Sequence, residues 1–457
     1  MKLKLIVASM SVLGLISCPT AVLAKKHHHK PKQQQTAQQQ DYKDMGSYKD
    51  MQEVCTISQS SIIMDEMTQN MGRAMPNPCN PGWFNRVQFS GGINVDVGKW
   101  GNRNANIMGE NYQRISLNDA YLNVSATVND WAKAFASLSY STPTTNADQA
   151  TYKGFGIAEY SAAYANNVLG GATNLVQVEQ AYATLGNFDV SPFFVQVGKQ
   201  FQDFGRYQIH PITRSLTQVM SETLATSLKA GFLMPMGLHG SVYVFDDPMN
   251  QAGSSSTSTN FGLALGYDQP SDQLGWDVGA AYLYNMMGVN DIAYQVANFT
   301  QQNGYNKRVG GYALYGDVNS GPFMIGARFV GTAGFNPGDL PQDGIAGVNG
   351  GQLITRTVSG PLTTQGGAKP WAAGVQAGYG FDAWGKNQNI YVGYQGSSQA
   401  AGLDLPRSRW LAGYNVDVWK STMLGIEWDH DNAYSASDGG SGNTTNLVSL
   451  RAGVNFN

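Results

Sequence analysis

The chain has 457 residues and a formal net charge of −3, with 42% hydrophobic and only 13% charged residues, 54 glycines and 23 tyrosines. This composition is typical of short β segments joined by glycine-rich turns, and the 11% aromatic content excludes a wholly disordered chain. The slight negative charge and the lack of basic clusters that track phosphates argue against a nucleic-acid partner. After residue 24, no apolar run is long enough for a membrane-spanning helix.

Residues 1–24 have the pattern of a secretory signal peptide. Two lysines precede an apolar stretch, Leu5 to Ile16, and the small residues Val22 and Ala24 place cleavage after residue 24. A second interpretation is a lipoprotein signal, because residues 15–18 resemble a lipoprotein cleavage site with Cys18 as the lipidated residue. Both interpretations predict export to the cell envelope.

Residues 25–82 are predicted to be a low-complexity and partly helical periplasmic extension. In an oxidising envelope compartment, Cys55 and Cys79 are expected to form a disulfide; the alternative is two free thiols. The triplet His27 to His29 has side chains that bind transition metals, but it is interpreted as a solvated basic tail, so no metal site is predicted.

From Trp83 to the C-terminus, apolar and polar residues alternate with period 2. Between Val87 and Val97, for example, every second residue is apolar or glycine, and Val448 to Phe456 repeats the pattern. The alternation predicts an all-β barrel in residues 83–457, with about sixteen strands at 87–97, 112–128, 131–141, 174–186, 192–200, 226–234, 237–246, 260–268, 273–285, 308–318, 321–332, 371–380, 389–396, 408–419, 421–430 and 446–456.

The connections between these segments alternate between short and long. The short ones are Asn129-Asp130, 187–191, Pro235-Met236, 269–272, Asn319-Ser320, 381–388 and Lys420, and the long ones are 98–111, 142–173, 201–225, 247–259, 286–307, 333–370, 397–407 and 431–445. Transmembrane barrels have this asymmetry, with short periplasmic turns, long extracellular loops and an even strand number.

The two faces of the predicted sheet differ in a way that favours lipid on one side and water on the other. Aromatic residues gather near strand ends, as in interfacial girdles, and Phe456 is the penultimate residue. The polar face carries charges that would be costly to bury unpaired but that a water-filled lumen solvates. The lumen-lining candidates are Lys199, Lys229, Arg328, Arg409, Glu427 and Arg451. A soluble secreted all-β protein is the alternative.

The third long connection, residues 201–225, is expected to fold into the barrel and narrow it. Ser215 and Gln218 have capping-box spacing, so 215–224 is predicted to form a helical turn or two. Its apolar face would pack on the inner wall, and the face with Arg214, Gln218 and Ser221 would face the channel. The constriction candidates are Asp203, Arg206, His210, Arg214, Gln218 and Glu222. The alternative is that these charges pair with one another and with the wall to fasten the loop.

No catalytic motif is found: the sequence lacks a P-loop, HExxH, CxxC or paired Ser and His spacing. The chain is therefore predicted not to be an enzyme and to need no cofactor. Residues 427–431 contain three acidic side chains and His430, which suits a divalent ion, although a solvated loop is the simpler interpretation.

One segment resembles a known family. The runs Val178 to Leu185, Val197 to Gln200, Pro211 to Gln218 and Ser221 to Thr223 resemble the LbtU-like siderophore porins of Gram-negative bacteria, with His210 where Asn is expected. The resemblance implies a sixteen-stranded outer-membrane barrel with a periplasmic N-terminal extension, and uptake of an iron–siderophore.

These observations together predict an outer-membrane, porin-like transporter for a siderophore or similar polar solute. Its expected partners are outer-membrane lipid and the solute, and the sequence leaves a homo-oligomer open. The alternatives are a general diffusion porin and a surface adhesin or structural barrel with a closed lumen.

Overall fold

The computed structural model describes residues 87–101, 112–140, 176–207, 212–254, 258–271, 273–300, 304–342, 347–349, 352–354 and 366–456. All of them belong to the second of two compact units, Ser47–Asn457. The predictions for the signal peptide, the extension and the Cys55–Cys79 disulfide lie outside the described residues, and so does His210.

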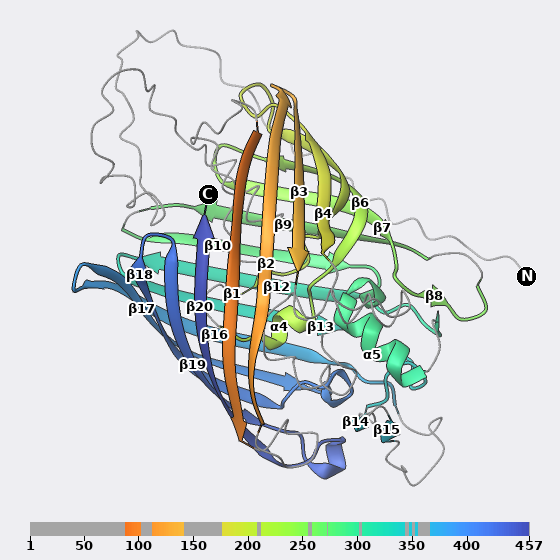
Figure 1. Ribbon diagram of the computed structural model, residues 1–457. Helices are drawn as coiled ribbons and strands as arrows, with labels where there is room; N and C mark the ends of the chain where they lie inside the picture. The colour runs from red at the N-terminus through yellow and green to blue at the C-terminus, as the bar shows by residue number, and fades with distance from the viewer. Residues whose placement is uncertain are drawn as a thin grey trace, which may run out of the picture. The chain divides into compact units, whose positions relative to one another are not determined.

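Sixteen antiparallel strands form one closed barrel, which confirms the predicted fold and strand number. Each strand pairs with the next one around the barrel, and the last pairs with the first (Figure 1). The strands are β1 (Val87–Gly101), β2 (Tyr112–Asn129), β3 (Ala132–Tyr140), β4 (Gln177–Leu185), β5 (Phe193–Phe201), β6 (Leu224–Leu233), β7 (Leu238–Asp246), β9 (Thr259–Gln269), β10 (Gly275–Leu283), β12 (Gly311–Ser320), β13 (Phe323–Thr332), β16 (Trp371–Ala383), β17 (Lys386–Ser398), β18 (Ser408–Trp419), β19 (Thr422–Asn432) and β20 (Thr444–Phe456).

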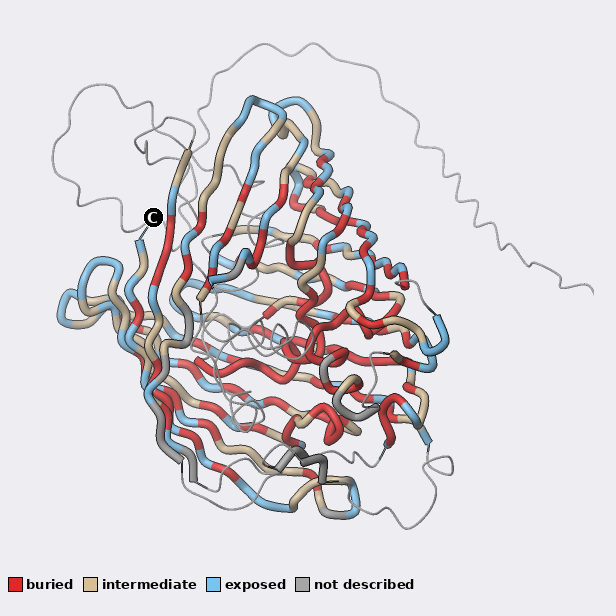
Figure 2. Tube along the Cα trace, turned by 45° about the vertical axis from the view of Figure 1, so that its right-hand side comes forward, coloured by how far each residue is buried: buried red, intermediate tan, exposed pale blue. Residues whose placement is uncertain are grey.

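The strands bury one face and expose the other, residue by residue (Figure 2). In β17, for instance, Tyr391 is 1% exposed, while the next residue, Val392, is 58% exposed. The exposed face is mainly Leu, Val, Ile and aromatic residues on nearly every strand, and such a surface is stable only against lipid. The inward face carries the polar and charged residues.

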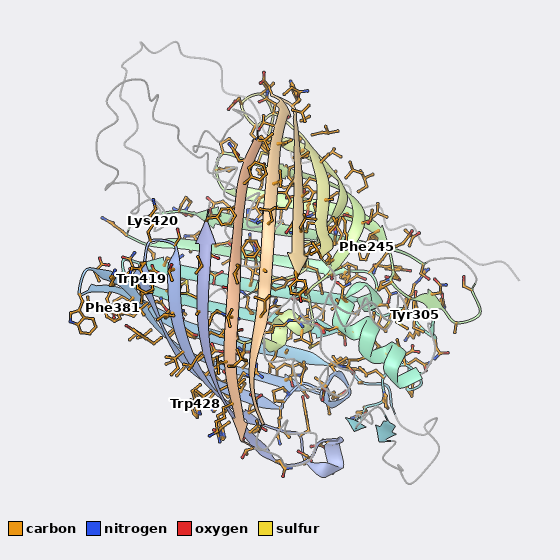
Figure 3. The ribbon with its side chains drawn as sticks, in the orientation of Figure 1. Phe245, Tyr305, Phe381, Trp419, Lys420 and Trp428 are labelled. Carbon is orange, nitrogen blue, oxygen red and sulfur yellow. The ribbon has the colours of Figure 1, made fainter. Side chains whose placement is uncertain are left out.

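All the tight turns lie at one end of the barrel, which we call the short-turn end. The connection predicted at 381–388 is wrong, because the turn is only Trp384 and Gly385, whose φ angles of 53° and 67° suit a two-residue type I′ hairpin. The polar residues around it are strand residues that pair across the hairpin. Figure 3 shows Phe381, Trp419 and Lys420 at this end, away from Phe245 and Tyr305.

The opposite end of the barrel, which we call the long-loop end, holds the helices and the short strands that are not part of the barrel sheet. The connection after β10, predicted as a long loop over 286–307, forms η2 (Met286–Gly288) and α5 (Asn290–Thr300). Ile292, Ala293 and Val296 lie on one buried side of α5, which explains the helix. The other elements of this end are α4 (Leu216–Val219), η4 (Ala401–Leu403), η5 (Ala436–Asp438), the paired strands β8 (Asn250–Gln251) and β11 (Gly304–Tyr305), and the paired strands β14 (Gly347–Asn349) and β15 (Gln352–Ile354).

Apolar residues from several of these loops form one buried cluster with the inner wall, which we call the loop cluster. It contains α4, η2 and α5 residues together with inward residues of β7, β10, β12, β13 and β16. Its members include Leu216, Val219, Met220, Tyr243, Phe245, Leu283, Met286, Ile292, Val296, Tyr305, Ala313 and Val330. Across the described parts of the chain, no helix is long and apolar enough to cross a membrane.

The lipid-facing assignment predicts the effect of a charge on the outer face. Val392→Lys places an ammonium group in the hydrocarbon layer and is expected to lower the free energy of unfolding by about 2–4 kcal/mol. Denaturant unfolding in lipid vesicles measures this. The control is Asn415→Lys on the inward face of β18, which is expected to change stability much less. Equal destabilisation by both variants would contradict the assignment.

Candidate functional site

The third loop, which we define as residues 202–223 between β5 and β6, reaches the far side of the barrel. Its described residues hydrogen-bond to β17, β18, β19 and β20. By the shorter way round the barrel, β4, β3, β2, β1 and β20 separate β5 from β19. The loop therefore crosses the interior, as predicted for a constriction.

Glu427 on β19 is the main anchor of this crossing. Its carboxylate accepts hydrogen bonds from the backbone N–H groups of Ile212 and Thr213, both at 2.8 Å, and from the Thr213 hydroxyl at 2.7 Å. The Tyr391 hydroxyl donates a fourth bond at 2.8 Å. A buried carboxylate needs this many donors, because each one replaces water that burial removes.

The position of Tyr391 depends on a glycine between it and Glu427. Tyr391, Gly413 and Glu427 are register partners on β17, β18 and β19. A Cβ atom on Gly413 would lie 2.1 Å from the tyrosine ring, so only glycine lets the ring lie flat across β18 and reach the carboxylate.

Two arginines beside Glu427 hold the loop by its carbonyl groups. Arg409 binds Asp431 through two nitrogens, at 2.7 and 2.8 Å, and donates to the Arg214 carbonyl at 3.0 Å. Arg451 binds Asp96 in the same way, at 2.8 and 2.7 Å, and donates to the Ile212 carbonyl at 3.3 Å. Three predicted lumen-lining residues, Glu427, Arg409 and Arg451, thus form the docking site of the third loop.

The helical turn predicted in this loop is present but shorter than 215–224. The Ser215 side chain caps α4 by accepting from the Gln218 N–H at 3.1 Å, and the Leu216 N–H donates to Gln395 on β17 at 2.7 Å. Leu224 is not helical, because its N–H and carbonyl bond to the side chain of Asn290, at 2.6 and 3.3 Å.

Two charges on the loop, Arg214 and Glu222, are paired with each other. Arg214 contacts Glu222 at 3.2 Å and Asp291 of α5 at 2.7 Å, and the Gln218 amide donates to Glu222 at 2.8 Å. The side chains of Arg214 and Glu222 are only 4% and 2% exposed, and Ser221 is buried as well. The expectation that this face looks into the channel is therefore wrong, and the alternative of mutual pairing describes Arg214 and Glu222.

This ion cluster has one cation and two carboxylates. Burial raises the pKa of Glu222 to about 7, against the opposing effect of Arg214, and Asp291 raises it further. A protonated Glu222 leaves Arg214 and Asp291 as a balanced pair, so the cluster holds a proton near neutral pH.

All but one of the remaining predicted residues lie along another part of the interior wall. Lys229 contacts Asp203 at 2.7 Å, and Ser241 donates to the same carboxylate. The prediction that Lys199 lines the lumen is wrong: it has the strand parity of the exposed Val195 and Val197, so it lies on the outer face of β5, where it donates to the Val178 carbonyl at 3.0 Å. The last two predicted residues, Arg206 and Arg328, pair with Asp277 at 3.7 Å and with Asp317 at 2.8 Å.

Several interior residues were not predicted as site residues. Strand parity places Asp277, Asp317, Tyr391 and Gln395 on the same inward face as the predicted charges, so this signal was present in the sequence. Asp291 has no such signal, because it lies in α5 and not in a strand.

The divalent-ion interpretation of residues 427–431 is not supported. Glu427, Asp429 and Asp431 are inward on β19, whereas His430 has the opposite parity and bonds to Asn446 at 2.9 Å. Where the structure describes the chain, no group of three or more His, Cys, Asp or Glu residues is placed to hold a metal ion.

Comparison with known proteins shows distant relatives. No family model matches the sequence. It is 25% identical over 357 residues to a UPF0422 protein of Coxiella burnetii, covering 77% of this chain and 65% of the relative. It is 24% identical over 370 residues to a UPF0422 protein of Legionella pneumophila, covering 75% and 62%. The chain thus spans less than two thirds of the length of these curated relatives.

Solved structures similar to this chain include outer-membrane proteins. Pseudomonas putida OprB has a TM-score of 0.51 at 11% identity, over 81% of this chain and 94% of OprB. The outer-membrane channel DcaP of Acinetobacter baumannii has a TM-score of 0.48 at 13% identity, over 81% and 97%. The likeness to OprB shows that the two chains share the same barrel fold.

Removing the main anchor tests the crossing. Glu427→Ala leaves two loop N–H groups without their acceptor, at a cost on the order of 3–5 kcal/mol. The loop is expected to detach, and trypsin is expected to cut the folded barrel after Arg214 much faster. Mass spectrometry of the fragments measures the rate. Trp428→Phe, on the outer side of the same strand (Figure 3), is the matched control and is expected to behave as wild type.

The raised pKa of Glu222 predicts how stability changes with pH. The folded state favours protonated Glu222, so its contribution is complete below the ordinary pKa of 4.5 and is lost as pH rises through about 7. Between pH 4.5 and 8, the wild type is expected to lose about 3 kcal/mol relative to Glu222→Gln, which cannot ionise. Denaturant unfolding at several pH values measures this. Parallel pH profiles for the two proteins would refute it.

Proposed function

We propose that this chain is an outer-membrane channel for a small polar solute, narrowed by its third loop. The closed barrel, the apolar outer face and the porin fold support a water-filled path through the membrane. The barrel has enough strands for an aqueous interior. In this proposal, the short turns face the periplasm and the long loops face the outside.

The observation that carries the proposal is the bond between the third loop and Glu427 on the opposite wall. A loop fixed at both ends and in the middle divides the cross-section of the barrel permanently. Solutes must then pass beside it, and their size and polarity decide whether they do.

The sequence resemblance to LbtU-like porins supports an iron–siderophore as the solute. It is sharpest over residues 175–235, a range that contains the third loop. A general diffusion porin is the broader alternative. The curated relatives are longer than this chain, so the proposal concerns the channel formed by this chain and not the partners of a whole relative.

A second candidate function rests on the loop cluster. Buried apolar side chains fill part of the interior at the long-loop end, as expected for a structural barrel or adhesin with a closed lumen. Such a barrel would fold normally and conduct no ions.

Single-channel recording in planar bilayers tests both candidates. The wild type is expected to conduct, and replacing residues 206–222 by a short Gly-Ser linker is expected to enlarge the conductance severalfold, because the crossing segment is gone. Shortening residues 436–442, in a different long loop, is the control and is expected to have little effect. A folded wild type that does not conduct would favour the closed barrel. An unchanged conductance in the protein with the Gly-Ser linker would refute the constriction.

Growth distinguishes siderophore uptake from general diffusion. A deletion strain is expected to grow poorly on limiting iron with its own siderophore and normally with excess ferrous iron. Equal growth of the deletion strain and the parent on limiting iron would support the general porin.

A further inference from the structure

The inner face of the wall formed by β10, β12 and β13 changes character along the barrel. At the long-loop end, Ala281, Ala313 and Val330 belong to the loop cluster. The next inward positions toward the short-turn end are Gly279, Tyr315 and Arg328, and then Asp277 and Asp317. A charged and aromatic surface therefore begins where the apolar packing stops.

Tyr315 lies flat on this surface. A Cβ atom on Gly279 would lie 2.3 Å from its ring and one on Gly266 would lie 2.5 Å from its hydroxyl, so the ring crosses β10 and β9 over two glycines. Its hydroxyl oxygen is 3.3 Å from Nε2 of His239 on β7. Tyr391 is set over a glycine in the same way but is buried, whereas Tyr315 is only half-buried.

Two arginines approach this ring from different parts of the chain. The guanidinium carbon of Arg206, on the third loop, lies 5.1 Å from the ring centroid, and that of Arg328 lies 6.0 Å away. Both distances are within the range of cation–π attraction. The ring thus fixes both cations at one place on the wall.

Each arginine has its own carboxylate. Arg328 binds Asp317 through two nitrogens, at 2.9 and 2.8 Å, whereas Arg206 and Asp277 are 3.7 Å apart. Asp277 and Asp317 are register partners on neighbouring strands, so the two carboxylates lie side by side, each with its own arginine. The five residues, which we call the Tyr315 group, have no net charge but separate positive and negative positions.

Three charges of the Tyr315 group are more open than Arg214 and Glu222. Arg206, Asp277 and Asp317 are 11%, 16% and 21% exposed, whereas Arg328 is 8% exposed. Arg214 and Glu222 are 4% and 2% exposed. A solute in the lumen can therefore reach these three charges of the Tyr315 group more readily than Arg214 and Glu222.

We propose that the Tyr315 group is the solute-binding site of the channel and that it selects dipolar solutes, which carry both an anionic and a cationic group. A guanidinium group binds the anionic end, a neighbouring carboxylate binds the cationic end, and the ring supports the chain between them. A solute whose charges are all of one sign gains one favourable contact and is repelled by the protein group of like charge. This inference rests on the proposed channel function and adds the class of ligand that the channel binds.

Three probes of equal chain length test the inference: zwitterionic 4-aminobutyrate, dianionic succinate and dicationic 1,4-diaminobutane. Single-channel current through the wild type is recorded with each probe at pH 7. The zwitterion is expected to interrupt the current at roughly tenfold lower concentration than either ion, the factor expected for one added charge-assisted contact.

Variants show whether the Tyr315 group causes the preference. Arg206→Gln is expected to remove the zwitterion preference and to favour the diamine, and Asp277→Asn is expected to favour succinate. Arg206→Lys keeps the charge and is expected to keep most of the preference. Arg308→Gln, an arginine outside the group, is the control and is expected to block as wild type.

The outcomes separate this inference from the proposed function. A folded protein that does not conduct would overturn the channel itself. A conducting protein that all three probes block equally, or whose preference survives both Arg206→Gln and Asp277→Asn, would overturn only the assignment of the site. Heat-dependent mobility on gels shows that each variant has folded before it is recorded.

Discussion

The interior of this barrel is organised by one buried carboxylate. The Glu427 carboxylate accepts hydrogen bonds from two backbone N–H groups and a hydroxyl of the third loop. It accepts another from the hydroxyl of Tyr391 on β17. Without these donors a charge at that depth would be unstable, and without the charge the loop would have no reason to cross. The flat ring of Tyr391, the glycine beneath it and the course of the third loop all depend on this contact.

The same wall shows how charges in a lumen are shared between structure and selectivity. Arg409 and Arg451 are each bound to an aspartate and use a further N–H to hold a loop carbonyl. They are inward, but their hydrogen bonds are directed at the protein. In the proposed channel, selectivity is left to the wall of β10, β12 and β13, where Arg206 and Asp277 are 3.7 Å apart and 11% and 16% exposed.

The sequence predicted most of the fold because one simple rule governs a membrane barrel. Alternation with period 2 fixes which residues face lipid and which face inward, so sixteen strands and the inward positions of Glu427, Arg409 and Arg451 follow from it. The rule failed at 381–388, where polar residues on both sides of a tight turn concealed the pairing of the strands.

The contacts inside the barrel could not be predicted in this way. Alternation places Glu427 inside and the third loop is expected to fold inward, but the contact between Glu427 and Thr213 depends on how the closed barrel places β19 relative to the loop. The pairing of Arg214 with Asp291 needs, in addition, a helix whose short apolar pattern resembles a loop. Solute-facing and loop-fastening charges look alike in sequence, because only their partners in three dimensions distinguish them.

The ion pair between Asp96 and Arg451 has a consequence for assembly. It joins the first strand to the last, and the same arginine holds the Ile212 carbonyl of the third loop. The contact between Arg451 and the third loop therefore cannot form until the C-terminal strand closes the barrel. A chain that has not yet closed its barrel, or one that has lost β20, lacks this contact, so the third loop is fully fastened only after closure.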